Sequence, residues 1–348
     1  MEVFRNDRRG PGLAALDAYP SDDVTAVRHL LDACPAHAIT PVLDLTELAT
    51  SIGVASILVK DERSRMGLGS FKALGAAYAI AREASLDGGR GDWGTALSDR
   101  VFVTASAGNH GLSVAAGARL FGARAVIYLS ASVPESFADR LHAKGAEVRR
   151  AGTTYEESMA EAEAAATSEG WTLLSDSSWP GYTETPFRVM EGYLQMAAEI
   201  VEQVKEVPTH VLLQAGVGGM AAAVAAHARR IWGDTPIIIV VEPDAAPALI
   251  ESVRAGEIVT TEGPVSAMGR LDCKTPSMIA LAGLARDADL FVTISEAEAE
   301  SAVERLAAQG IATTPSGAAG LAALISGLPD MTRTARVLAI LSEGSEVG

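Results

Sequence analysis

The stretch from residue 210 to residue 220 reads His210-Val211-Leu212-Leu213-Gln214-Ala215-Gly216-Val217-Gly218-Gly219-Met220. Its first half is short and apolar, as in a buried β-strand, and its glycines predict a tight turn into a helix that continues to Arg230. In such a turn successive backbone N–H groups converge, and the helix N-terminus adds positive potential. The stretch therefore predicts a strand, a helix and, between them, a phosphate cradle formed by Gly216, Val217, Gly218, Gly219 and Met220.

Further strands on both sides of this unit predict the fold class. Short apolar or β-branched runs occur at residues 56–60, 101–104, 125–129, 147–149, 171–174, 237–241, 289–293 and 336–341, and alanine-rich helical stretches separate most of them. Strands that alternate with helices predict βαβ units and parallel sheets. The wholly apolar run 237–241 is typical of a strand buried on both faces. Because the runs gather around 100–150 and 210–295, we expect two open α/β sheets with a cleft between them.

Composition and charge argue against several classes of function. The net charge of −16 over 348 residues disfavours nucleic acid and anionic membrane surfaces as partners. Two cysteines, Cys34 and Cys273, are too few for a disulfide framework and indicate a reducing compartment. Residues 1–12 have no apolar signal core, and no apolar run reaches the roughly 18 residues of a membrane span. We expect a cytoplasmic protein that acts on a small molecule, with the glycine-rich segment 87–92 as a surface loop.

Lys72 lies in the run Ser70-Phe71-Lys72-Ala73-Leu74-Gly75, where Ser70 is expected to cap a helix that begins at Phe71. The positive end of the helix dipole disfavours a second positive charge, so we expect a lowered pKa for Lys72 and an amine that can attack an aldehyde. An isolated lysine is usually an ordinary exposed charge. An amine at a helix start combined with a separate phosphate cradle, however, is what a phosphorylated aldehyde needs. The pattern points to pyridoxal phosphate attached to Lys72, with Phe71 beside it.

A second strand-to-helix turn, Ser106-Ala107-Gly108-Asn109-His110-Gly111, offers side-chain and backbone donors. Asn109 is suited to bind the phenolic oxygen of the cofactor. The Ser106 hydroxyl and the N–H groups around Ala107 and Gly108 are suited to bind a substrate carboxylate. Helix capping alone would explain Ser106 or Asn109 but not the whole run. His110, on the substrate side of the turn, is expected to pack or to orient the loop.

Two serines compete for the pyridine nitrogen of the cofactor. Ser342 follows the predicted strand 336–341 at its carboxyl end, where ligands bind in open α/β sheets, and Ser316 lies in the turn 314–318. A hydroxyl there leaves the nitrogen largely unprotonated, which favours prompt loss of a β-leaving group over a long-lived carbanion. Either serine can also be an ordinary turn or cap residue. Asp176, in the loop after the strand 171–174, is by itself an ordinary turn aspartate, and no metal site is predicted because the cysteines lack partners at metal-ligand spacing.

The glycines also permit other interpretations. Gly216-x-Gly218-x-x-Ala221, with Glu242 at the end of the next strand, nearly matches the dinucleotide fingerprint in which the acid binds a ribose hydroxyl. An NAD-dependent oxidoreductase would leave Lys72 and the Asn109 turn without a role, so this alternative ranks second. A non-catalytic small-molecule-binding protein is the third alternative, and it need not retain the lysine, the asparagine turn and the cradle together.

Several short motifs also carry a family resemblance. They are Val59-Lys60-Asp61-Glu62, Met66-Gly67-Leu68, Phe71-Lys72-Ala73-Leu74-Gly75, Tyr78-Ala79-Ile80, Gly108-Asn109-His110-Gly111, the run 176–182, Gly216-Val217-Gly218 and Ser342-Glu343-Gly344. Together they resemble the fold type II pyridoxal-phosphate enzymes, related to tryptophan synthase β, and within them most of all the diaminopropionate ammonia-lyases. The resemblance extends over most of the chain. It implies two open, mostly parallel three-layer α/β domains with the cofactor in the cleft, of which residues 1–62 plus 187–348 form the large one and residues 63–186 a small mobile one, in a homodimer.

The resemblance also implies roles for two residues. The lysine that matches Lys72 carries the cofactor and removes the α-proton of one substrate enantiomer, and the aspartate that matches Asp176 is implicated for the other enantiomer. The implied reaction is an α,β-elimination in which a β-substituted amino acid such as 2,3-diaminopropionate gives a 2-keto acid and ammonia.

Position 107 departs from the pattern of those lyases. They typically carry an aspartate just before Gly-Asn-His, placed to interact with the diamine substrate, whereas this chain has Ala107. The run around Ala107 is similar to the serine and threonine dehydratases instead. Without the carboxylate a β-ammonium group loses a natural partner. Dehydration of a hydroxy amino acid is therefore the alternative within the same reaction class.

Overall fold

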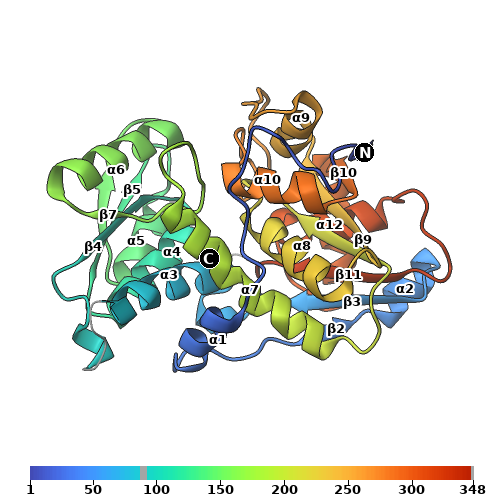
Figure 1. Ribbon diagram of the computed structural model, residues 1–348, viewed down its shortest axis with the longest axis horizontal. Helices are drawn as coiled ribbons and strands as arrows, with labels where there is room; N and C mark the ends of the chain where they lie inside the picture. Colours follow the sequence, from blue (N-terminus) through green and yellow to red (C-terminus); the bar gives the residue numbers. More distant parts are fainter. Residues whose placement is uncertain (87–91, 346–348) are drawn as a thin grey trace.

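The computed structural model describes residues 1–86 and 92–345, so most of the predicted loop 87–92 lies outside the described residues. The chain forms two lobes, each built around its own open sheet (Figure 1). The larger sheet has the strand order β1-β10-β9-β8-β11-β3-β2 and the smaller one has the order β6-β5-β4-β7. Neighbouring strands are parallel except at the two edges of the larger sheet, where β1 and β2 pair antiparallel.

The strands of the larger sheet are β1 (Glu2–Arg5), β2 (Val42–Asp44), β3 (Ser56–Asp61), β8 (His210–Gln214), β9 (Ile237–Pro243), β10 (Leu290–Ile294) and β11 (Arg336–Leu341). Those of the smaller sheet are β4 (Val101–Ala105), β5 (Arg124–Leu129), β6 (Glu147–Arg150) and β7 (Thr172–Leu173). The predicted strands are confirmed to within a few residues. β1 and β2 were not predicted, because short edge strands with charged residues lack the apolar run that marks a central strand.

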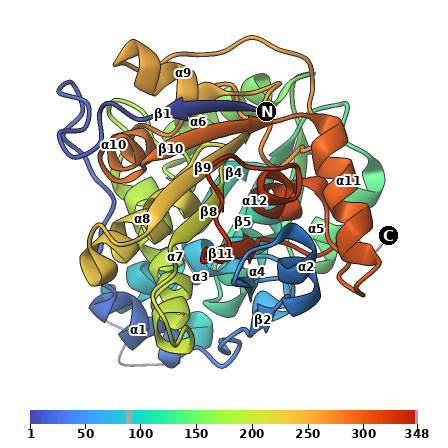
Figure 2. The same ribbon diagram turned by 90° about the vertical axis from the view of Figure 1, so that its right-hand side faces the viewer.

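Helices cover both faces of the larger sheet, as Figure 2 shows from the side. One face packs against α7 (Glu184–Gln203), α8 (Gly219–Trp232) and α10 (Met278–Asp287), and the other against α2 (Thr46–Ile52), α11 (Glu296–Ala307) and α12 (Pro315–Ile325). Residues of β8 show the alternation directly: Val211 and Leu213 enter one core, and Leu212 enters the other. The elements α1 (Thr25–Asp32) and α9 (Ala248–Ala255) complete this lobe.

The smaller sheet is also the middle of three layers. α3 (Lys72–Leu86), α4 (Asn109–Leu120) and α5 (Glu135–Ala143) lie toward one face, and α6 (Tyr155–Glu169) covers the other. Phe102 and Val103 on β4 belong to different cores, because successive side chains of a strand point to opposite faces of the sheet. The predicted fold class, two open and mostly parallel three-layer α/β units, is confirmed. All strands of the smaller sheet lie within residues 101–173, inside the range predicted for a small domain.

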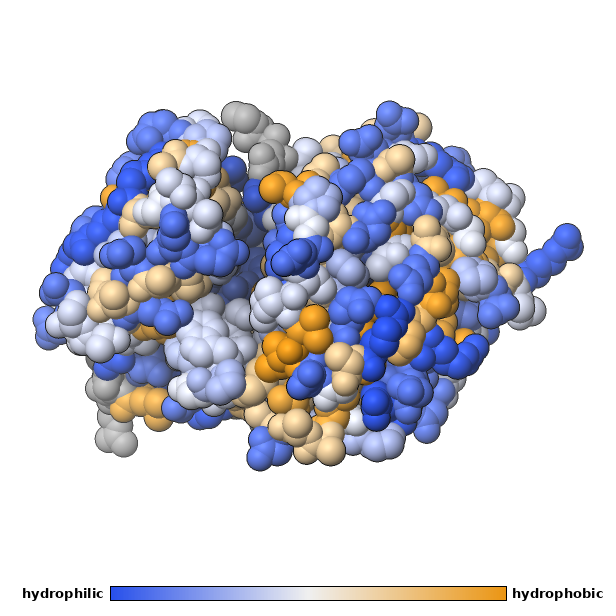
Figure 3. Space-filling view, turned by 90° about the horizontal axis from the view of Figure 1, so that it is seen from above, coloured by the Kyte–Doolittle hydropathy of each residue, from blue (hydrophilic) through white to orange (hydrophobic). Residues whose placement is uncertain are grey.

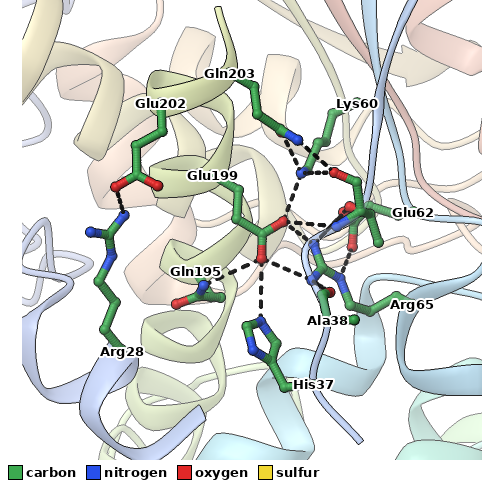
Figure 4. A network of polar contacts seen from close by, with 11 residues as sticks. Arg28, His37, Ala38, Lys60, Glu62, Arg65, Gln195, Glu199, Glu202 and Gln203 are labelled. Atoms are coloured by element: carbon green, nitrogen blue, oxygen red, sulfur yellow. Dashed lines mark hydrogen bonds and ion pairs between the residues drawn. The ribbon is translucent and has the colours of Figure 1, made fainter. Parts of the chain in front are cut away.

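A buried polar cluster ties the segment that leads to Lys72 to helix α7 (Figure 4). Glu199 of α7 accepts hydrogen bonds from Lys60 Nζ at 2.6 Å and from the guanidinium of Arg65 at 2.7 and 2.9 Å. Arg65 also donates two bonds of 2.7 Å to Glu62. These side chains are essentially inaccessible to solvent. Their mutual pairing is what makes such charges tolerable in the interior, and it fixes residues 60–65 against α7.

A cleft separates the two lobes, and Figure 3 shows the surface hollowed between them, with hydrophilic residues along its walls. Among the described residues, none of the helices has the length and apolar character required to cross a bilayer.

Candidate active site

The predicted site residues lie at the carboxyl ends of strands that face the cleft. Gly216 follows β8, Ser342 follows β11, Asn109 follows β4 and Asp176 follows β7. Lys72 opens α3 after a longer connection from β3. This is the edge of an open α/β sheet at which ligands bind.

Lys72 is the first residue of α3, and its backbone N–H donates to Ser70 Oγ at 3.3 Å, so Ser70 acts as the predicted cap. The Lys72 ammonium donates to the Asp176 carboxylate and lies 5.2 Å from the ring centroid of Phe71. Hydrogen bonds from the Phe71 N–H to the Ser342 carbonyl, 3.1 Å, and from the Gly344 N–H to the Gly69 carbonyl, 3.0 Å, fix this segment against the end of β11.

The predicted lowering of the Lys72 pKa is wrong for the chain by itself. Burial does favour the neutral amine, but the adjacent Asp176 carboxylate outweighs burial and holds the pKa of Lys72 above its ordinary value. In the same way burial raises the pKa of Asp176, and the nearby Lys72 ammonium outweighs it and holds that pKa well below the usual range. A direct ion pair dominates the weaker helix dipole. Sequence spacing gave no sign that Asp176 contacts Lys72, which is 104 positions away.

The phosphate cradle has no room for side chains. A Cβ atom at Gly216 would lie 2.9 Å from Cys273 Sγ and 3.0 Å from the Leu271 Cα. Gly218 has φ +97° and caps α8, a conformation that L side chains rarely adopt. A Cβ at Gly219 would lie 3.2 Å from Met190 Cγ. The first N–H groups of a helix have no partner within it, so the start of α8 offers donors to an anion, while the Val217 N–H is directed at the Cys273 thiol.

Two residues that the sequence analysis did not assign to the site connect Lys72 with the cradle. The Tyr193 ring, on α7, lies 5.9 Å from Lys72 Nζ and packs edge-on against Phe71 with centroids 4.9 Å apart. Its Cε2 atom also lies 3.6 Å from the Cβ position of Gly219. Cys273 borders Gly216, and burial raises the pKa of its thiol to about 12. Tyr193 is an internal residue of a long helix, and no local motif indicates that it faces the site.

The Asn109 turn contacts the other lobe through Glu343. The Asn109 side-chain amide donates to the Glu343 carboxylate, which also accepts a 2.5 Å bond from Thr314 Oγ1. The side chain of Arg270 contacts the same turn. Its Nη1 donates to the Ala107 carbonyl at 3.5 Å, and its Nε lies 3.8 Å from Glu343 Oε2. Glu343 was quoted within a family motif but given no role, and Arg270 was not predicted at all.

Ser106 and His110 shape the turn from within. The Ser106 hydroxyl accepts from the N–H groups of Gly108 and Gly111 at 3.3 and 3.0 Å, so it caps the helix start, the simpler of its two predicted roles. His110 is buried, and its Nε2 contacts the Leu174 carbonyl at 2.7 Å. Burial lowers the pKa of His110, which favours the neutral ring. This contact agrees with the expectation that His110 packs and orients the loop.

The two candidate serines differ in their surroundings. Ser316 lies in the first turn of α12, and its hydroxyl accepts from the Arg270 N–H at 3.1 Å. Ser342 lies beside the Lys72 segment, because its carbonyl binds the Phe71 N–H. Both serines therefore stay candidates for the pyridine nitrogen.

The dinucleotide alternative is contradicted at Glu242. This side chain is completely buried and accepts from the N–H groups of Leu249 and Ile250 at 2.8 and 2.9 Å. Burial raises its pKa to about 8. A carboxyl group that caps α9 in the interior cannot bind a ribose hydroxyl in the cleft.

The residues present fit pyridoxal phosphate. Lys72 supplies the amine and the start of α8 supplies backbone N–H donors, and both border Tyr193. The Tyr193 hydroxyl is buried and makes no hydrogen bond among the described residues, which leaves a polar group available to a ligand. Lys72, the cradle, Asn109 and Ser342 are the residues that would hold the cofactor. A separate surface hollow of about 940 Å³ lies at the amino ends of β3 and β11, where Ser56 and Arg336 border it. None of the residues that would hold the cofactor lines this hollow.

This fold and this site define a pyridoxal-phosphate-dependent enzyme of fold type II. Residues 34–343 match the family model described as "Pyridoxal-phosphate dependent enzyme", and the chain belongs to that family. It is 34% identical over 292 residues to the diaminopropionate ammonia-lyase of Salmonella typhimurium, which covers 78% of this chain and 71% of the relative. It is 28% identical over 295 residues to the human L-serine dehydratase/L-threonine deaminase, with 84% of both chains covered.

A solved structure of diaminopropionate ammonia-lyase from Escherichia coli, in complex with an aminoacrylate-PLP azomethine reaction intermediate, superimposes with a TM-score of 0.88. It shares 30% identity and covers 99% of this chain and 93% of that chain. These similarities confirm the family, the cofactor and the lyase class predicted from the sequence, and they support elimination as the chemistry.

Proposed function

We propose that this enzyme catalyses the α,β-elimination of a β-substituted amino acid to a 2-keto acid and ammonia. The observation that carries the proposal is the Lys72–Asp176 pair, which Tyr193 connects with the glycine cradle. The pair places an amine and a carboxylate side by side, and each is a group that can accept an α-proton. The relatives named as diaminopropionate ammonia-lyases support the same chemistry.

Each residue has a distinct task in this proposal. Pyridoxal phosphate, when bound, supplies the electron sink that acidifies the α-carbon. The Lys72 Nζ atom takes the α-proton of one enantiomer, and Asp176 serves the other. The N–H groups of the Asn109 turn that do not donate to Ser106 would bind the substrate carboxylate, and the Ser342 hydroxyl would face the pyridine nitrogen. Because Asp176 raises the pKa of Lys72, it also governs when the amine is free to react.

A hydroxy amino acid is the second candidate substrate class. It is supported by Ala107, which offers only a methyl group beside the cleft, and by the likeness to a human serine dehydratase. The predicted small domain of residues 63–186, a homodimer and a cytoplasmic location also belong to the proposal, and the first two rest on the family resemblance.

The test is the release of ammonia and 2-keto acid from serine, threonine, 2,3-diaminopropionate and their D-enantiomers by the holoenzyme. Lys72→Ala should lower turnover by roughly 100- to 10,000-fold, because it removes the base, while its far-ultraviolet circular dichroism stays unchanged. A folded Lys72→Ala variant with full activity would exclude the proposed role of Lys72. An enzyme that releases no keto acid from any β-substituted amino acid would exclude the elimination.

A further inference from the structure

Arg270 lies between the phosphate cradle and the Asn109 turn. Its backbone carbonyl is 3.1 Å from the Cβ position of Gly216 in the cradle, and its N–H is held by Ser316 at 3.1 Å. Its side chain extends from there to the Asn109 turn, where Cδ and Nε both lie 3.4 Å from the Cβ position of Gly108. Arg270 thus spans the distance from the phosphate cradle to the loop that is expected to bind substrate.

The side chain of Arg270 is held in place but still reachable. It is 31% exposed, whereas the Glu343 side chain behind it is only 7% exposed. Glu343 accepts from Asn109 and Thr314 and lies 3.8 Å from Arg270 Nε, so it orients the guanidinium as well as the turn. A planar guanidinium fixed in this way suits bidentate binding of a carboxylate or a phosphate.

Three carboxylates of the site are already engaged. Asp176 pairs with Lys72, and Asp272 pairs with Lys274 at 2.7 Å. Glu343 has the contacts described above, and position 107 is an exposed alanine. A β-ammonium group would therefore meet the positive charge of Arg270 beside Ala107, with each of these carboxylates occupied by another partner. Like charges in a partly desolvated cleft repel, and opposite charges attract.

We propose that Arg270 selects β-substituted amino acids whose β-substituent carries a negative charge, over those with a neutral or positive one. The inference rests on the proposed elimination and specifies its substrate class. Two kinds of amino acid carry a negative charge at this position and can undergo the elimination. In O-phosphoserine the phosphate is the leaving group, and in 3-hydroxyaspartate a carboxylate stays on the β-carbon while hydroxide leaves.

The chemistry balances in both cases. The Cα–H bond breaks and its proton passes to Lys72 Nζ, the electron pair forms the Cα=Cβ bond, and the Cβ–O bond breaks with its pair leaving on oxygen. O-phosphoserine and one water then give pyruvate, ammonia and inorganic phosphate. 3-Hydroxyaspartate loses one water, gains one and gives oxaloacetate and ammonia.

The experiment compares kcat/KM of the holoenzyme for O-phosphoserine, 3-hydroxyaspartate, serine and 2,3-diaminopropionate. The kcat/KM for at least one of the two anionic substrates should exceed the values for serine and for 2,3-diaminopropionate. Arg270→Gln should lower the ratio of kcat/KM for that substrate over serine by about 10-fold or more, mainly through KM. Arg270→Lys should restore part of this ratio, and Arg270→Glu should shift preference toward 2,3-diaminopropionate. Arg254→Gln, which removes an arginine of α9 paired with Glu251, should leave the ratio unchanged.

The outcomes separate the inference from the function on which it rests. If serine or 2,3-diaminopropionate is turned over and both anionic substrates are poor, the elimination stands and the role of Arg270 is wrong. If Arg270→Gln weakens serine and the anionic substrates equally, Arg270 binds the α-carboxylate, and the selectivity proposal is overturned. If no substrate yields keto acid, the proposed function itself fails. The wild-type ranking tests the inference even if an Arg270 variant does not fold.

Discussion

At the scale of single residues, the ion pair between Lys72 and Asp176 controls the reactivity of the chain before the cofactor binds. An amine attacks an aldehyde only when it is neutral. Asp176 stabilises the protonated form of Lys72, and burial alone would have the opposite effect. The carboxylate therefore opposes the first chemical step, attachment of the cofactor.

Asp176→Asn should lower the pKa of Lys72 and speed attachment of pyridoxal phosphate at neutral pH. The fraction of neutral amine rises about 10-fold for each unit by which the pKa falls, so the rate at pH 7.5 should rise by about that factor or more. The pH–rate curve should move to lower pH. Stopped-flow absorbance of the apo-protein mixed with cofactor measures both. Asp176→Glu, which keeps the charge, should retain the wild-type pH dependence, and an unshifted curve for Asp176→Asn would contradict this account.

The cradle offers a second test at this scale. Gly216→Ala places a Cβ 2.9 Å from Cys273 Sγ, so the loop must shift away from its position. Overpacking of this kind costs about 1–3 kcal/mol, which corresponds to a roughly 10- to 100-fold weaker affinity for pyridoxal phosphate. Equilibrium dialysis measures the affinity. Gly269→Ala is the matched control, because the nearest atom to its Cβ position is 3.9 Å away. An equal loss of affinity for pyridoxal phosphate in both variants would contradict the role of residues 216–220 as its phosphate cradle.

At the scale of elements, the sequence predicted the central strands well and the edge strands poorly. A central strand such as β9 is buried over most of its length and apolar from residue 237 to residue 241, whereas β1 contributes Glu2 and Arg5 to a sheet edge. Lys72, the cradle and Asn109 were predictable because local spacing places them at helix starts. Tyr193, Arg270 and the role of Glu343 were not, because they reach the site through contacts between elements far apart in the chain.

Helix α7 depends on Glu199, which accepts bonds from Lys60 and Arg65 in the interior. Glu199→Gln should lower the free energy of unfolding at pH 7 by about 3–5 kcal/mol, because Lys60 loses its buried ion-pair partner and Arg65 loses one of its two. Glu202→Gln on the same helix is the control: Glu202 is 54% exposed in its pair with Arg28, so the loss should be about 1 kcal/mol or less. Denaturant unfolding measures both, and similar values for the two variants would contradict the role of the buried cluster (Figure 4).

The same cluster predicts how stability changes with pH. Burial raises the pKa of Glu199, but hydrogen bonds from His37 and Arg65 outweigh it and hold the pKa far below the ordinary value. A depressed folded-state pKa gives stability that is present above the unfolded-state pKa of about 4.3 and is lost as pH falls below it. The difference between wild type and Glu199→Gln should therefore narrow from pH 5 to pH 3. A constant difference over that range would show that Glu199 is not ionised in the folded protein.

At the scale of the whole molecule, the site is assembled from both lobes. Asn109 contacts Glu343 across the cleft, and Ser178 bonds to Ser277 at 2.7 Å at the start of α10. Closure of two domains over a substrate excludes water and completes a catalytic site. Small-angle X-ray scattering should show a smaller radius of gyration for the holoenzyme with a non-reacting substrate analogue than without it. An unchanged radius would argue against a mobile domain of residues 63–186.

The central claim is that Lys72 holds pyridoxal phosphate in the cleft between the lobes. The direct test is an absorbance spectrum of the protein with cofactor, before and after borohydride reduction, followed by mass spectrometry of its peptides. We predict a visible band that reduction abolishes and a pyridoxyl label on Lys72 that is missing in Lys72→Ala. Failure to form the band with added cofactor, or a label on another lysine such as Lys60 or Lys274, would contradict the account.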